Sequence, residues 1–197
     1  MITIIISGTP GTGKTTISTF LSTKLGATLI SLNKLIIDKN LTLSYDKERE
    51  THIADTDKCI EYLVEKINNL KTKGIPYLII ESNFSDIVPD EFIDYAIILR
   101  CHPKVLYNRL KERNYNEKKI KENIQAEILG ECANFLIQKK LKRPVLEFDT
   151  SQEGLNDIVD KISAILNEKG TILEHKIGKI DWLGELDKKD QLNKYFD

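Results

Sequence analysis

The chain has 197 residues and a mass of 22.6 kDa, the size of one large domain or of one domain with a small insertion. Hydrophobic residues make up 41% and charged residues 30%, a balance that is typical of a folded, water-soluble protein. The net charge of −1 argues against capture of nucleic acid or of an anionic membrane by the charge of the protein as a whole.

The first half of the chain contains three continuous apolar runs and three segments with helical spacing. Strands are predicted at Ile2–Ser7, Ala27–Leu32 and Tyr77–Glu81. Helices are predicted at Lys14–Leu25, Asn33–Lys39 and Asp57–Lys71, and residues 40–50 are expected to be irregular. The N-terminal run is too short to span a bilayer, lacks a basic leader and enters a glycine-rich turn, so we interpret it as a strand and not as a signal peptide.

The second half continues the same alternation. Strands are predicted at Tyr95–Leu99 and Val145–Asp149. Helices are predicted at Pro103–Arg113, Lys118–Lys140 and Leu155–Leu166, the long one with Ile120, Ile124, Ile128, Cys132 and Phe135 on one face. The pattern predicts a single α/β domain over residues 1–197, with a five-stranded parallel sheet flanked by helices.

The C-terminal residues 169–197 are expected to form a tail. Trp182 is interpreted as the anchor that docks this tail, and the charged end after Leu186 is expected to fray. The histidines His52, His102 and His175 are scattered and form no metal-ligand pattern.

The three cysteines lie far apart in the sequence and include no Cys-x-x-Cys pair. Cys59, Cys101 and Cys132 are therefore expected to be reduced thiols, which predicts a cytoplasmic protein.

The strongest chemical motif is Gly8-Thr-Pro-Gly-Thr-Gly-Lys-Thr15, which fits the P-loop pattern G-x-x-x-x-G-K-[ST] between a predicted strand and a predicted helix. Backbone N–H groups of such a loop surround phosphates, and the helix N-terminus adds its positive end. Lys14 is expected to reach the β and γ phosphates, and Thr15 to place its hydroxyl on Mg²⁺. The predicted nucleotide-binding residues here are Gly8, Gly11, Thr12, Gly13, Lys14, Thr15 and Thr16.

The chain is therefore expected to bind ATP or GTP, and the missing Asn-Lys-x-Asp motif weakens the GTPase interpretation. Arg109 and Arg113 are four residues apart and share one face of a predicted helix. They either clamp a phosphoryl group in transfer or are solvated surface charges, and the spacing alone leaves both open.

Further motifs resemble the adenylate kinase isoenzyme six family over nearly the whole chain. They are Arg-Leu-x-x-Arg-x-Tyr-x-Glu-Lys-Lys-Ile at 109–120 and Glu-Asn-Ile-Gln-Ala-Glu-Ile at 122–128, and the tail at 178–183 resembles the archaeal branch. The resemblance implies phosphoryl transfer from ATP to AMP with Mg²⁺, and it leaves ATPase activity open. It also implies a monophosphate-binding insertion at 33–72, a short lid at 109–117, and a role in small-subunit maturation with a ribosomal protein of the platform.

Two positions depart from the family pattern. Glu81-Ser82-Asn83 stands where the family usually carries Asp-x-His, and Ile37 stands at about the place of an arginine in eukaryotic members. Glu81 is still expected to hold a Mg²⁺-bound water. Asn83 can form hydrogen bonds but cannot act as a base.

Arg100 follows the fourth predicted strand, and its position suggests a grip on AMP and on the transferring phosphoryl group, with Arg109 and Arg113. A surface ion pair is the alternative for Arg100.

Other polar residues have two interpretations each. Asp149 is predicted to lie beside the adenine, although Ser151 close by equally suits an N-cap of the next helix. Asp55 and Asp57 match an acidic stretch of the family, but Asp57 is favoured as the N-cap of its own helix.

Two other functions remain open. One is an ATP-switched assembly factor that binds a basic ribosomal protein through the acidic stretches Asp46–Asp57 and Asp86–Asp94. The alternative interpretation of these stretches is that they are solvated loops. The other is a kinase for a different small molecule, such as a nucleoside or shikimate, since P-loop kinases share these features.

Overall fold

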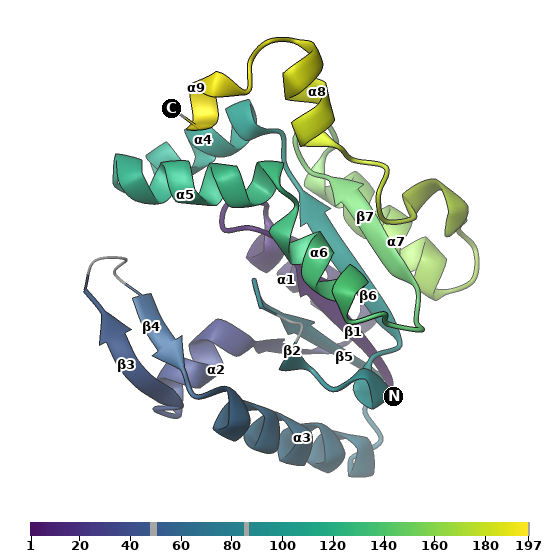
Figure 1. Ribbon diagram of the computed structural model, residues 1–197. Coiled ribbons are helices and arrows are strands. Elements are labelled where there is room, and N and C mark those ends of the chain that lie inside the picture. The colour runs from purple at the N-terminus through teal and green to yellow at the C-terminus, as the bar shows by residue number, and fades with distance from the viewer. Residues whose placement is uncertain (48–50, 85–86, 197) are drawn as a thin grey trace.

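The computed structural model describes residues 1–47, 51–84 and 87–196, and its centre is a five-stranded sheet (Figure 1). The strands lie in the order β2-β5-β1-β6-β7 and every pair is parallel. Their bounds are β1 Ile2–Ser7, β2 Thr28–Ser31, β5 Tyr77–Glu81, β6 Tyr95–Arg100 and β7 Val145–Asp149. The predicted five-stranded parallel sheet is thus confirmed.

Helices cover both faces of the sheet, which explains why its strands are apolar throughout. On one face α1 (Lys14–Leu25) and α7 (Leu155–Leu166) pack on Ile4 and Ile6, and on the other α3 (Thr56–Thr72) and α6 (Glu131–Gln138) pack on Ile5. All three isoleucines are completely buried.

A third apolar cluster lies above the sheet in Figure 1. It joins α4 (Pro103–Glu112), α5 (Glu117–Ile128), α8 (Trp182–Lys188) and α9 (Asn193–Phe196). Because Leu192 and Tyr195 pack against it, the prediction that the chain frays after Leu186 is wrong. Trp182 is buried, which confirms its predicted role as the anchor of the tail.

The segment between β2 and α3 contains α2 (Leu32–Asp38) and a small second sheet. Residues 40–50 are not irregular as expected, because β3 (Thr42–Asp46) pairs antiparallel with β4 (Thr51–Ala54). The alternation of polar and apolar residues in β3 is a strand signal, but its apolar members are exposed, Leu43 by 68%, so it does not resemble the buried strands. Residues 48–50 and Asp86, which belong to the two acidic stretches, lie outside the described residues.

Two helix boundaries differ from the predictions. Helix α3 begins at Thr56, and its N-cap is Asp55 and not Asp57, since the Asp55 carboxylate accepts a hydrogen bond from the N–H of Lys58 at 3.3 Å. The predicted helix at Lys118–Lys140 is two helices, because Gly130 has a φ of 65° and turns the chain between α5 and α6. After this turn α6 buries Ala133 and Leu136 and leaves Phe135 45% exposed.

Within the described ranges, every helix is too short or too polar to cross a membrane.

Candidate active site

The P-loop is the turn between β1 and α1, at the centre of the sheet (Figure 1). Gly8, Gly11 and Gly13 all have positive φ values, of 146°, 94° and 95°. A side chain at Gly8 would collide with the carbonyl oxygen of Leu99, and a Cβ at Gly11 would lie 2.6 Å from the Leu106 side chain. These glycines are therefore required by the path of the backbone.

Lys14 opens α1, and its ammonium group lies back over the loop. It donates to the carbonyl oxygens of Gly8 at 2.7 Å and of Thr9 at 3.2 Å. Burial lowers the pKa of Lys14, and the positive charge of Arg113 adds to this effect, against the carboxylates of Glu81 and Glu127. The lysine charge is thus held in a desolvated place beside the loop.

Thr15 and Glu81 form the predicted magnesium pair. The Thr15 hydroxyl donates to Glu81 Oε2 at 3.3 Å, and the Ser31 hydroxyl donates to Glu81 Oε1 at 2.7 Å. Hydroxyl and carboxylate oxygens are the hard donors that Mg²⁺ takes, so these residues fit the ion. Sequence reasoning missed Ser31, although its position at the end of β2 places it at the same edge of the sheet as Glu81.

Asn83 is tied to the helix that follows β2. The Ser82 hydroxyl donates to Asn33 Oδ1 at 2.9 Å, and Asn33 Nδ2 donates to Asn83 Oδ1 at 2.9 Å. The amide of Asn83 therefore has a partner where the family pattern has a histidine.

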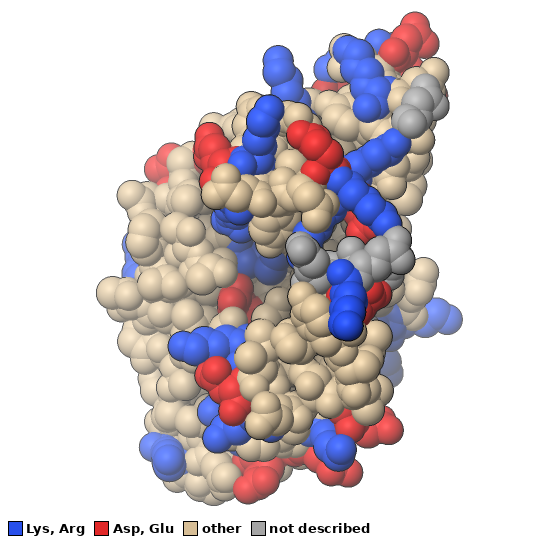
Figure 2. All heavy atoms as spheres, turned by 90° about the vertical axis from the view of Figure 1, so that its left-hand side faces the viewer, with Lys and Arg blue, Asp and Glu red and all other residues tan. Residues whose placement is uncertain are grey.

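A cavity of about 540 Å³ opens beside the P-loop. Its wall combines four parts of the chain. They are Lys14, Thr15 and Thr16 of the P-loop helix, Asn33, Lys34, Ile37, Asp38 and Thr51 between β2 and α3, Glu81, Ser82 and Asn83 at the end of β5, and Arg113, Tyr115 and Lys119 from the end of α4 to the start of α5. In Figure 2, which faces this side of the molecule, Lys and Arg side chains gather around a central hollow. We call this cavity the P-loop pocket.

Arg109 in α4 and Arg113 at the C-terminal cap of this helix point to different places. Arg113 lines the P-loop pocket. Arg109 instead bridges the P-loop and the turn after β7, because it donates to the Thr150 carbonyl at 2.6 Å, to the Thr150 hydroxyl at 3.0 Å and to the Gly11 carbonyl at 3.5 Å. Both arginines therefore lie against the P-loop, from two sides.

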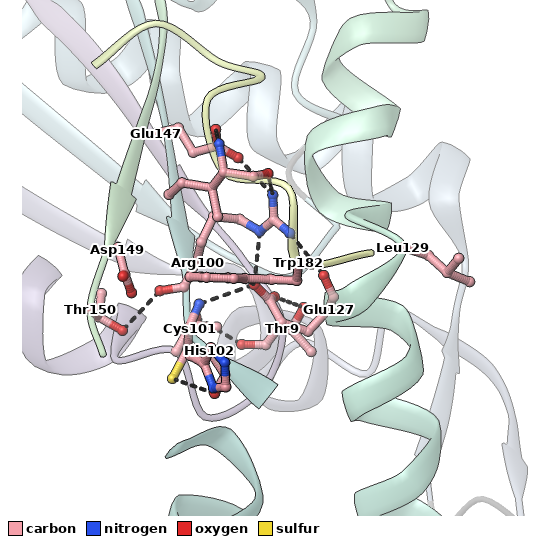
Figure 3. Close-up of polar contacts among 12 residues, drawn as sticks. Thr9, Arg100, Cys101, His102, Glu127, Leu129, Glu147, Asp149, Thr150 and Trp182 are labelled. Carbon is pink, nitrogen blue, oxygen red and sulfur yellow. Dashed lines mark hydrogen bonds and ion pairs between the residues drawn. The ribbon is translucent and has the colours of Figure 1, made fainter. Parts of the chain in front are cut away.

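Arg100 does not line the P-loop pocket, and Figure 3 shows its contacts with Glu127 and Glu147. It is 4% exposed and forms ion pairs of 2.7 Å with both Glu127 and Glu147. Burial opposes its charge, but the two carboxylates prevail and raise the pKa of Arg100. This placement corrects both interpretations of Arg100, because the side chain neither faces the pocket nor forms a surface ion pair.

The partners of Arg100 were missed in the sequence. The only sign of them in the sequence is that each glutamate stands inside an apolar pattern. Glu147 lies in the apolar strand β7, and Glu127 lies beside Ile124 and Ile128 in α5. A buried carboxylate needs a cation or several hydrogen-bond donors, which such a pattern does not name.

Asp149 ends β7 and closes the turn that follows. Its Oδ1 accepts hydrogen bonds from the N–H of Ser151, at 2.8 Å, and from the Ser151 hydroxyl. Because α7 begins only at Leu155, after Gly154, the alternative of Ser151 as its N-cap is wrong.

Comparisons with known proteins agree with this geometry. A family model described as an AAA domain matches residues 4–130. The chain is 34% identical over 194 residues to a Methanocaldococcus jannaschii protein named "Putative adenylate kinase", with 98% of this chain and 95% of that protein covered. It is 34% identical over 127 residues to the adenylate kinase isoenzyme 6 homolog of Caenorhabditis elegans, with 64% and 68% covered. A solved structure described as a "putative kinase" from Chloroflexus aurantiacus shares the fold, with a TM-score of 0.55, 24% identity, and 86% of this chain and 97% of that chain covered.

Proposed function

This chain belongs to the adenylate kinase isoenzyme 6 family, and we propose that it transfers the γ-phosphoryl group of ATP to AMP, giving two ADP. The observation that carries the proposal is the P-loop pocket, because its wall joins a phosphate-binding loop to two other segments that can hold an acceptor. A second nucleotide beside the phosphates of the first is what this transfer needs.

The phosphates of ATP would lie on the P-loop. Backbone N–H groups of the loop and the N-terminus of α1 supply positive charge there. Phosphate oxygens are stronger acceptors than the carbonyls of Gly8 and Thr9, so Lys14 would turn from these carbonyls to the β and γ phosphates. The residues proposed to hold ATP are Gly8, Gly11, Thr12, Gly13, Lys14, Thr15, Thr16 and Arg109, with Asp149 shaping the turn nearby.

Thr15 and Glu81 would hold Mg²⁺, the first directly and the second through a bound water. When bound, the ion would neutralise charge on the phosphates.

AMP would enter between the residues after β2 and the sheet. Asn33, Lys34 and Asp38 offer polar groups on that wall, and Arg113 faces them from the end of α4. Arg113 would stabilise the phosphoryl group in transfer, together with Arg109 once its guanidinium turns from the carbonyls of Gly11 and Thr150 to phosphate. Closure of the short lid at 109–117 would exclude water and so favour transfer over hydrolysis.

A protein base is not required, since positioning and charge supply most of the rate in phosphoryl transfer. This agrees with Asn83, whose amide cannot take a proton and is bonded to Asn33. We therefore expect ATP hydrolysis without AMP to be slow.

The test is ADP production by the purified protein from Mg²⁺-ATP, with and without AMP, beside the Lys14→Met and Arg109→Ala variants. We expect ADP to form when AMP is present and to fall by about 10²-fold or more in Lys14→Met, because the phosphates lose their cation. Equal ADP formation without AMP would indicate an ATPase and contradict the proposal. A screen of other phosphate acceptors, a nucleoside and shikimate among them, would identify a different kinase.

The family resemblance further supports a cytoplasmic role in small-subunit maturation, with a ribosomal protein of the platform as partner. A pull-down of small-subunit proteins with and without ATP tests this part. If no small-subunit protein is pulled down either with or without ATP, the maturation role is refuted, and the kinase proposal stands unchanged.

A further inference from the structure

Thr9 is a P-loop residue whose side chain points away from the P-loop pocket and into the protein. It is 2% exposed, and its hydroxyl donates to Glu127 Oε2 at 2.6 Å. Its carbonyl oxygen accepts from Lys14 Nζ at 3.2 Å and from the Thr12 hydroxyl at 2.8 Å. Thr9 therefore links the resting position of Lys14 to a carboxylate behind the loop.

Besides Thr9, Glu127 accepts hydrogen bonds from two other parts of the chain, the end of β6 and the start of α8 (Figure 3). Its Oε1 receives Arg100 Nε at 2.7 Å, the N–H of Cys101 at 3.0 Å and the indole N–H of Trp182 at 3.2 Å. The residue is 1% exposed, so these donors replace water around its charge. A displacement of the carboxylate on one side therefore changes the hydrogen bonds on the other.

Trp182 belongs to the start of α8, in the tail. It lies 55 residues from Glu127 in sequence, is 6% exposed, and meets the ring of His102 edge to face at 5.2 Å between centroids. The indole is thus fixed by packing and by one hydrogen bond, and that bond goes to the carboxylate that also receives Thr9.

We propose that Glu127 is a positioning residue that fixes Thr9, and through it Lys14, and that it couples the P-loop to the tail anchor Trp182. When Lys14 leaves the Thr9 carbonyl for phosphate, this carbonyl keeps only one of the two side chains that donate to it, the Thr12 hydroxyl. The hydrogen bond from the Thr9 hydroxyl to Glu127 then readjusts. The indole N–H reports this change. Because Thr9 and Trp182 share this carboxylate, a change at Trp182 in turn alters the affinity for ATP. The proposal rests on the proposed function only in that the P-loop binds ATP.

The test uses the protein's single tryptophan as the probe. Emission of Trp182 is recorded in the full chain without nucleotide and during titration with Mg²⁺-ATP, while calorimetry gives the ATP affinity independently. Thr9→Val removes the hydroxyl and nearly preserves the volume, and it leaves the Arg100, Cys101 and Trp182 donors in place. Thr9→Ser is the matched control because it retains the hydroxyl.

We expect ATP to change the emission of Trp182 in the wild type and in Thr9→Ser, and to leave it unchanged in Thr9→Val at saturating ATP. Loss of one hydrogen bond to a buried carboxylate should also weaken ATP binding by roughly tenfold in Thr9→Val. A merely structural role of Glu127 would lower stability in Thr9→Val but would keep the ATP-dependent emission change.

The reverse direction uses Trp182→Phe, which keeps an apolar ring and removes the N–H donor. The KM for ATP should rise several-fold in this variant while kcat with saturating ATP is retained, since the reacting groups are untouched. Wild-type ATP affinity in both Thr9→Val and Trp182→Phe would overturn the inference. Absence of ATP binding in the wild type would overturn the proposed function itself, so the two failures are distinguishable.

Discussion

Two regions meet at the P-loop, and they use charge in opposite ways. Behind the loop, Arg100, Glu127 and Glu147 form a buried cluster in which one cation and several hydrogen-bond donors stabilise the two carboxylates. In front of it, the rim of the P-loop pocket carries exposed charged groups such as Lys34 and Arg113. The difference shows that arginines close in sequence can have separate roles. Arg100 stabilises the fold through buried ion pairs, and Arg113 is available to bind a ligand in the pocket.

The largest effect should come from breaking the buried cluster. Arg100→Met leaves Glu127 and Glu147 without their shared cation, so we expect a loss of about 3–5 kcal/mol in the free energy of unfolding. Urea denaturation measures this loss. Arg143→Met, at an exposed position, is the control and should change stability by less than about 0.5 kcal/mol. An equal effect of both substitutions would show that the cluster contributes nothing special.

The rim should respond in activity and not in stability. Arg113→Ala removes a cation that faces the pocket, and we expect kcat for ADP formation to fall by about 10²-fold. The thermal midpoint should stay at the wild-type value because Arg113 is exposed. Lys111→Ala, two residues earlier in α4 and outside the pocket lining, is the control for charge. Wild-type kcat in Arg113→Ala would remove this residue from the proposed mechanism.

The smallest effect concerns a region away from both. His175 stacks on Phe148 at 4.2 Å between ring centroids, and burial, with the nearby charge of Lys161, lowers the pKa of His175. Because the folded state binds this proton less readily than the unfolded state, stability is present above the ordinary histidine pKa of 6.5 and falls as the pH drops through it.

The variant that tests this is His175→Phe, which retains the ring stack. Its thermal midpoint should fall less than that of the wild type between about pH 8 and about pH 5.5, by up to about 2 °C, since the ring is only partly buried. Differential scanning fluorimetry at both pH values measures the difference. Identical pH dependence in the two proteins would mean that His175 titrates as it does in an unfolded chain.

The parts of this molecule that follow local rules were predictable. The isoleucine-rich run of β1 and the P-loop after it carry their own pattern, so the sheet and the position of Lys14 followed from the sequence. The N-cap of α3 was misplaced because Asp55 and Asp57 are both suitable residues and only the backbone chooses between them. The break at Gly130 was missed because the apolar spacing continues across it.

The buried cluster could not be predicted for a different reason. Arg100 and Glu127 come from separate elements, and Thr9 meets Glu127 across 118 residues of sequence. Predictions from sequence patterns use residues that are close along the chain, and they place a charged residue on the surface by default. Only the packing of α5 and the tail against the strand ends shows that these charges compensate one another.

The order of the strands also constrains how the protein is made. β1 is translated before both of its partners in the sheet, which are β5, where Ile2 meets Tyr77, and β6, where Ile4 meets Tyr95. The central strand therefore has no partner in the sheet until β5 has been translated, and contacts so distant in sequence form slowly. Nascent chains that end before Glu127 would have a P-loop without the carboxylate behind it. The ability to bind nucleotide should consequently appear only after α5, which carries Glu127, has been translated.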